Sequence, residues 1–248
     1  MKLRKDKKQM DLDRMLQAVP VFLMLLALVY IGINNHYFFK VNNLISVLLQ
    51  TASLAIMAMG MTLVLITGGI DLSIPPVMGA SAILGTLYMQ KGGNPLTAFL
   101  LMLAVAMICG LINGFAIAYL KMIPFIVTLS LQMITYGACL WLAADGVSGV
   151  AEGFQNVLLF KVGGLIPLPI LLVVLLMFFV ELFLKKSFIG RQLYVTGTNV
   201  KMADVSGIPS REIILAAYVL SGLFAALAGA VYIARMGAAS ASMGADTA

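Results

Sequence analysis

Few residues of this sequence could do chemistry, and the most conspicuous is an isolated acid within the stretch TGGIDLSIPP, residues 67–76. Asp71 is the only charged residue between positions 41 and 90. An acid between two long apolar tracts is costly unless nearby groups or a substrate stabilise its charge. Asp71 is therefore a candidate for a transport pathway, with a purely structural role as the simpler explanation.

Catalytic and metal-binding groups are not assembled elsewhere in the sequence. His36 is the only histidine, and the chain has no phosphate-cradling GxxxxGK[ST] motif, so we expect no ATP hydrolysis by the chain itself. Glu181 lies four residues before Lys185, which predicts an ordinary helical ion pair. Cys109 and Cys139 lie inside apolar runs without metal or redox spacing. We expect no enzyme activity, no catalytic residue, no metal site and no cofactor.

Composition determines the fold class. Of the 248 residues, 62% are apolar and 10% charged, and the mean hydropathy is +1.04. Soluble domains are usually about 45–50% apolar and about 25% charged, so lipid must cover part of this surface. A membrane-crossing helix needs roughly 20 apolar residues. The sequence predicts an all-α, multi-pass transmembrane bundle with about seven spans, at roughly 16–34, 44–67, 74–90, 96–120, 124–143, 166–184 and 212–234.

The basic residues are concentrated in two places, the tail 1–15 and the segment 185–211. Such clusters mark cytoplasmic segments, and six crossings after a cytoplasmic N-terminus bring the chain back to the cytoplasm at Lys185. The net charge of +6 therefore indicates topology and no nucleic-acid partner. We expect a single transmembrane domain over 1–248. Small residues at helical spacing, such as Gly110 with Gly114, predict close helix packing in lipid.

The stretch 67–76 predicts a break between two helices. Gly68 and Gly69 interrupt one apolar helix, and Pro75 suits the first turn of the next. We expect Asp71 or Ser73 to cap that second helix by accepting its free backbone N–H groups. Broken helices with polar ends at membrane depth often line transport pathways.

The cytoplasmic segment 185–211 predicts one short helix. Asn199 can cap a helix over roughly 200–206, Gly207 can end it in the left-handed conformation, and Pro209 forbids its continuation. The simpler interpretation is a capped connecting loop, and the functional one is a docking element for a soluble partner.

At these two stretches the sequence resembles the permease subunits of bacterial ribose-type sugar ABC importers. Residues 68–73, GGIDLS, match one motif of that family in full. The second, cytoplasmic motif is matched by Gly190, Arg191, Gly197, Asn199, Ala203, Ser206, Gly207 and Ile208. The resemblance covers about residues 40 to 235, and we expect that the chain lacks the C-terminal spans usual in the family.

The resemblance implies a permease in the bacterial inner (cytoplasmic) membrane that moves a monosaccharide or related small polar solute. It implies two permease subunits, cytoplasmic ATPase subunits and a periplasmic sugar-binding protein as partners, with lipid around the spans. Arg191, Asn199, Ala203 and the run 206–208 would then contact the ATPase, and Gly68, Gly69, Asp71 and Ser73 would form the helix break on the pathway. An ion-coupled secondary transporter that uses Asp71 is the alternative.

Overall fold

The computed structural model describes residues 2–244, with side chains from residue 18 to residue 243. The basic side chains of the predicted cytoplasmic tail, 1–15, therefore lie outside the described residues. The backbone divides into two compact units, residues 1–48 and 49–248. In the first unit, α1 (Lys2–Asn34) ends at Asn34, and α2 (Val41–Ile66) begins after a short turn and continues into the second unit.

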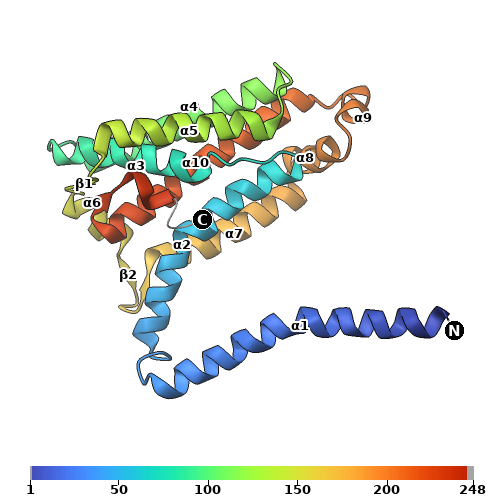
Figure 1. Ribbon diagram of the computed structural model, residues 1–248. Helices are drawn as coiled ribbons and strands as arrows, with labels where there is room; N and C mark the ends of the chain where they lie inside the picture. Colours follow the sequence, from blue (N-terminus) through green and yellow to red (C-terminus); the bar gives the residue numbers. More distant parts are fainter. Residues whose placement is uncertain (1, 245–248) are drawn as a thin grey trace. The chain divides into compact units, whose positions relative to one another are not determined.

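The described residues are almost entirely helical, as the sequence predicts (Figure 1). The second unit continues from α2 through α3 (Ile74–Gln90), α4 (Pro95–Ala118), α5 (Pro124–Ala143), α6 (Glu152–Leu158), α7 (Leu168–Lys186), α8 (Phe188–Thr198), α9 (Val200–Val205), α10 (Ser210–Met236) and the 3-10 turn η1 (Ala241–Gly244). Its strands are two residues long: β1 (Val147–Ser148) pairs with β4 (Ala238–Ala239), and β2 (Lys161–Val162) pairs with β3 (Ile166–Pro167), both antiparallel.

Each of the seven predicted spans coincides with a helix. Among the described residues, α2, α4, α5, α7 and α10 are long and apolar enough to cross a membrane, and Ala18–Asn34 of α1 is a shorter apolar helix. The interval 74–90 forms α3, which has 17 residues and is preceded by the non-helical segment 67–73. The total number of crossings and the orientation of the N-terminus stay predictions.

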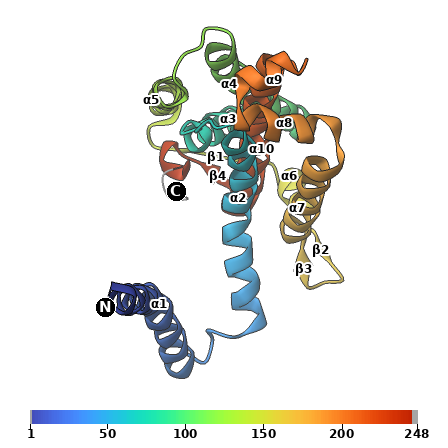
Figure 2. The same ribbon diagram turned by 90° about the vertical axis from the view of Figure 1, so that its right-hand side faces the viewer.

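The centre of the second unit is built by α3, α4 and α10 (Figures 1 and 2). The closest approach, between α4 and α10, depends on glycine, because a side chain on Gly110 would overlap the carbonyl oxygen of Tyr218. A side chain on Gly222 would likewise overlap the carbonyl oxygen of Ala106. The predicted small-residue packing is therefore confirmed, and it holds two long helices in backbone contact.

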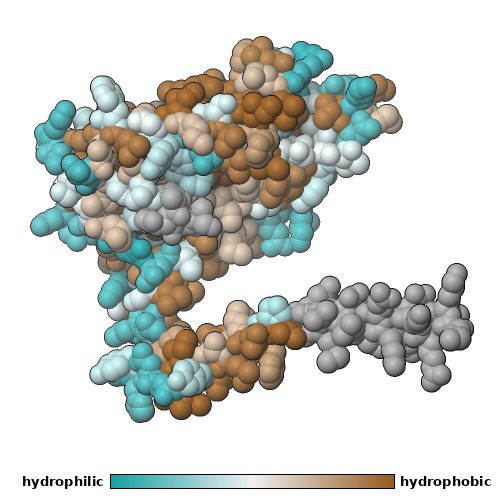
Figure 3. All heavy atoms as spheres, viewed as in Figure 1, coloured by the Kyte–Doolittle hydropathy of each residue, from teal (hydrophilic) through white to brown (hydrophobic). Residues whose placement is uncertain are grey.

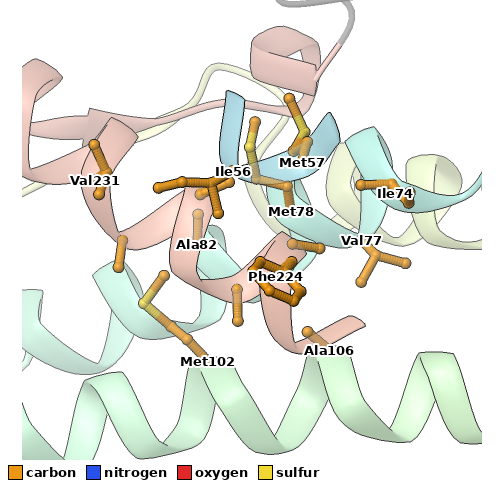
Figure 4. Close-up of a cluster of buried hydrophobic side chains, with 14 of the residues drawn as sticks. Ile56, Met57, Ile74, Val77, Met78, Ala82, Met102, Ala106, Phe224 and Val231 are labelled. Carbon is orange, nitrogen blue, oxygen red and sulfur yellow. The ribbon is translucent and has the colours of Figure 1, made fainter. Parts of the chain in front are cut away.

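The apolar core lies where α2, α3, α4 and α10 meet. Figure 4 shows side chains from these four helices in one cluster. They include Ile56 of α2, Met78 of α3, Met102 of α4 and Phe224 of α10, of which the first three are fully buried. Large apolar side chains also cover much of the outer surface (Figure 3), which is expected where lipid is the solvent.

Candidate functional site

The non-helical segment 67–73 brings Asp71 into the middle of the second unit. Here α2 ends at Ile66, and Gly68 takes a positive φ of 81°, which an L side chain rarely adopts. The N–H of Gly69 then closes back onto the carbonyl oxygen of Val64 at 3.2 Å. The two glycines therefore end α2 as the sequence predicts, and they turn the chain inward.

Asp71 is 3% exposed, and its carboxylate is held by three protein donors. Oδ1 accepts hydrogen bonds from the backbone N–H of Ser73 at 3.0 Å and from the hydroxyl of Ser73 at 2.6 Å. Oδ2 accepts a hydrogen bond from the hydroxyl of Ser221, on α10, at 2.9 Å. Both carboxylate oxygens are thus engaged inside the protein, which is the way a buried acid is made tolerable.

Asn113 of α4 extends this network. Its Nδ2 donates to the hydroxyl oxygen of Ser73 at 2.8 Å, while its Oδ1 is buried without a partner. We call Asp71, Ser73, Asn113 and Ser221 the polar centre; all four are buried. The hydrogen bonds run in one direction, from Asn113 to Ser73 to Asp71, so Asp71 is the final acceptor.

The predicted capping role of Asp71 and Ser73 is wrong. Ser73 does occupy the N-cap position of α3, but its side chain makes no capping hydrogen bond. Residues 75 and 76, at the second and third helical positions, are both proline, so the N–H groups that a cap would bind do not exist. The hydroxyl of Ser73 is therefore free to serve the polar centre.

Several residues that contact the helix break were not predicted from the sequence. Asn113 and Ser221 were not predicted, although each lies beside a glycine of the packing faces, Gly114 and Gly222, and that neighbourhood was the available signal. The carbonyl oxygen of Ile70 accepts from the hydroxyl of Thr128 at 3.3 Å and lies 3.5 Å from the hydroxyl of Tyr218.

A groove of about 350 Å³ reaches Asp71 from the outside. It lies between α2, the segment 71–75 and α5, and most of its lining is apolar. Gln132 of α5 and Asp71 are the polar residues of this lining. The groove therefore brings an amide and the edge of the polar centre to one surface. Among the described residues, no group of three or more histidine, cysteine or acidic side chains could hold a metal ion.

The second candidate region is the pair α8 and α9. Asn199 lies between the two helices and accepts a hydrogen bond from the N–H of Met202 at 3.1 Å through its side-chain oxygen. Gly207 follows α9 with a φ of 78°, and Pro209 stands at the N-cap of α10. The predicted capped short helix is therefore confirmed. Sequence reasoning missed α8, the helix of 11 residues before it.

The predicted coupling residues differ in their exposure to the surface. Ala203 is buried, whereas Arg191, Asn199, Ser206 and Gly207 are exposed and Ile208 is half-buried. The prominent apolar side chains of α9 are Met202, which is 61% exposed, and Val205, which is 84% exposed. At the end of α7, the predicted ion pair of Glu181 with Lys185 is confirmed, with 2.5 Å between Oε1 of Glu181 and Nζ of Lys185.

Long apolar helices that pack around a buried polar centre identify an all-α, multi-pass membrane protein. The chain belongs to the family described as branched-chain amino acid transport system / permease component, which it matches over residues 43–248. This match and the import permeases described below together confirm the resemblance to permease subunits of bacterial sugar ABC importers and a location in the bacterial inner membrane.

Individual relatives agree with this family. The chain is 34% identical to the ribose import permease protein RbsC of Bacillus subtilis, covering 98% of this chain and 76% of the relative. It is 32% identical to the fructose import permease protein FrcC of Rhizobium meliloti, covering 92% of this chain and 66% of the relative. Over 90% of this chain and 70% of the relative, it is 32% identical to the autoinducer 2 import system permease protein LsrD of Escherichia coli. No solved structure matches the chain.

Proposed function

We propose that this chain is the transmembrane permease subunit of an ATP-driven importer for a monosaccharide or a related small polar solute. A separate cytoplasmic subunit hydrolyses the ATP, and the chain itself performs no catalysis. The names of the relatives, which are import permeases for ribose, fructose and autoinducer 2, support the transport role and the class of solute. The full importer contains a second permease subunit and a periplasmic sugar-binding protein.

The observation that carries this proposal is the exposure of α9. A one-to-two-turn helix that is capped at both ends and joined directly to the long helix α10 is rigid enough to transmit force. Its exposed Met202 and Val205 provide the apolar contact that a groove on an ATPase subunit would cover. Ala203 then serves the packing of α9 against its own chain, while Asn199 and Gly207 fix its two ends.

The helix break forms part of the solute pathway in this proposal. Gly68 and Gly69 provide the turn, and Ser73 orients Asp71 at the inner edge of the groove. Sugar hydroxyl groups need hydrogen-bond partners along a largely apolar path, and Gln132 and Asp71 are the groups that this groove offers. The polar centre also keeps the broken segment in place, since its hydrogen bonds join the segment to α4 and α10.

An ion-coupled carrier centred on Asp71 explains the structure less well. Both oxygens of that carboxylate are already bonded to protein donors, and the exposed α9 has no role in a carrier that needs no ATPase. The relatives, moreover, are named as permease proteins of import systems.

Co-purification from native membranes tests the proposal. The tagged full-length chain should bring down an ATPase subunit and a periplasmic binding protein, identified by mass spectrometry, and the Met202→Asp variant should lose the ATPase. A control variant, Val157→Asp, changes an exposed valine of α6 and should retain it. Isolation of the chain without any ATPase, under conditions that preserve other membrane complexes, would contradict the proposal.

A further inference from the structure

The inner face of α8 is built for close contact at both of its ends. Gly190, Leu193 and Gly197 follow one another at helical spacing, and Leu193 is 1% exposed. A side chain on Gly190 would overlap the carbonyl oxygen of Phe183 in α7. A side chain on Gly197 would overlap the carbonyl oxygen of Ile66, the last residue of α2. Helix α8 therefore meets α7 and the end of α2 with no room for a side chain (Figure 1), and it also packs against α10.

The contact between Gly197 and Ile66 is one of backbone against backbone. A Cβ at position 197 would also lie 2.9 Å from the carbonyl carbon of Ile66 and 3.2 Å from the Cα of Thr67. Backbone groups cannot rotate away as a flexible side chain can, so a movement of α8 toward α2 must displace the end of α2. The neighbouring Thr196 is fully buried, and Gly197 itself is half-buried.

The chain on the far side of the contact leads directly to the polar centre. Asp71 follows Ile66 by five residues, which span at most about 17 Å even when fully extended. The intervening segment is held closely by its neighbours. A side chain on Gly69 would overlap the hydroxyl of Tyr218, and the carbonyl oxygen of Ile70 accepts a hydrogen bond from the hydroxyl of Thr128. A displacement at Ile66 is therefore passed along the segment to Asp71 and the groove.

We propose that Gly197 is a positioning residue for transport, because its contact with Ile66 transmits movement of the cytoplasmic helices α8 and α9 to the Asp71 segment. This inference rests on the proposed function, since an ATPase bound at α9 supplies the movement. It assigns a mechanical connection to α8 in addition to the direct junction of α9 with α10, against which α8 also packs. Closure of the ATPase subunits moves α9, α8 follows, and the segment 67–73 is displaced where it borders the groove.

The test compares Gly197→Ala with Gly137→Ala in importers reconstituted with the ATPase and binding protein that co-purify with the chain. Gly137, on α5, has open space where a Cβ would stand, so it provides a matched control. We expect Gly197→Ala to assemble and to hydrolyse ATP, with solute uptake per ATP reduced about fivefold or more. Gly137→Ala should retain the wild-type ratio. Wild-type uptake per ATP in Gly197→Ala would overturn the proposal.

A second measurement keeps the proposal testable if Gly197→Ala does not assemble. A single cysteine is placed at Leu72, on the groove, after Cys109→Ala and Cys139→Ala remove the native thiols. The rate at which a water-soluble thiol reagent labels this cysteine should differ between the nucleotide-free and the ATP-analogue-bound complex. Addition of Gly197→Ala, where it assembles, should abolish the difference. A rate that is the same in both states without Gly197→Ala would overturn the inference. A wild-type chain that binds no ATPase would instead overturn the proposed function.

Discussion

Ser221 donates a hydrogen bond to Asp71 over 2.9 Å, although the two residues are 150 positions apart in the chain. This bond joins the helix break to the middle of α10, while Asn113 joins it to α4 through Ser73. Asp71 is thus held by both of the helices that pack most closely in the second unit. Asp71, the only charged residue between positions 41 and 90, therefore anchors the non-helical segment 67–73 to two helices.

The anchor role predicts different outcomes for two substitutions of Asp71. In Asp71→Asn, one oxygen can still accept from Ser73, and the amide can donate to the hydroxyl of Ser221, which rotates to accept it. In Asp71→Leu, the donors of Ser73 and Ser221 are buried without an acceptor, at a cost of about 1–3 kcal/mol for each group. Thermal unfolding of the purified protein in detergent should show a small fall in unfolding temperature for Asp71→Asn and a large fall for Asp71→Leu.

The exposed acid Asp145 provides the control for these variants. Asp145→Asn and Asp145→Leu should both unfold at the wild-type temperature. Equal stability of Asp71→Asn and Asp71→Leu would contradict the anchor role.

The direction of the hydrogen bonds predicts the behaviour of Asn113. In Asn113→Asp, an ionised side chain could not donate to Ser73, and a second carboxylate would be buried without a partner. Burying a second carboxylate beside Asp71 without a positive partner is costly, so this variant should lose more free energy of unfolding than one that keeps the position uncharged. Asn113→Leu removes one hydrogen bond but also removes the unpaired Oδ1. Its free energy of unfolding should therefore fall by only about 1 kcal/mol. Chemical denaturation measures both, and a more stable aspartate variant would contradict the assigned directions.

The positions of the long helices along the chain could be predicted from sequence, because a helix surrounded by lipid needs a long apolar run. Each of the seven intervals coincides with a helix, of which five are long and apolar enough to cross a membrane among the described residues. The short helix after Asn199 was also predicted, since its cap residues act locally. The partners of Asp71 could not be predicted. Ser221 and Asn113 meet it only through the crossing of α4 with α10, and no local pattern encodes which faces of two helices come together. The capping role failed for a local reason, the two prolines that remove the N–H groups.

The backbone contact between α4 and α10 predicts a strong effect of added volume. In Gly222→Val, the new side chain would meet the carbonyl group of Ala106, which cannot move aside without separating the two helices. Overpacking of this kind typically costs about 1–3 kcal/mol. The matched change Gly137→Val adds the same volume where there is open space, and its unfolding temperature should be that of the wild type. A similar fall in unfolding temperature in Gly222→Val and Gly137→Val would contradict the packing role of Gly222.

The turn that ends α9 predicts a variant in which ATP hydrolysis is uncoupled from solute uptake. Gly207 has a φ of 78°, a conformation that costs an L residue about 1–2 kcal/mol. In Gly207→Val the short helix should lose its fixed connection to α10, so ATP hydrolysis should continue while uptake falls. Membrane insertion should be unchanged, because the position is exposed and outside the long helices. Gly153→Val, at an open position of α6, is the control, and normal uptake in Gly207→Val would count against the coupling role.

Import of a small sugar-like solute with energy from ATP hydrolysed by a partner is the function that we propose for this permease. Its most direct test is uptake of radiolabelled ribose, fructose and autoinducer 2 into liposomes that contain the chain with its co-purified ATPase and binding protein. We expect uptake of at least one of these solutes that requires ATP and persists when ionophores remove proton and sodium gradients. Uptake that follows an ion gradient in the absence of ATP would contradict the proposed function.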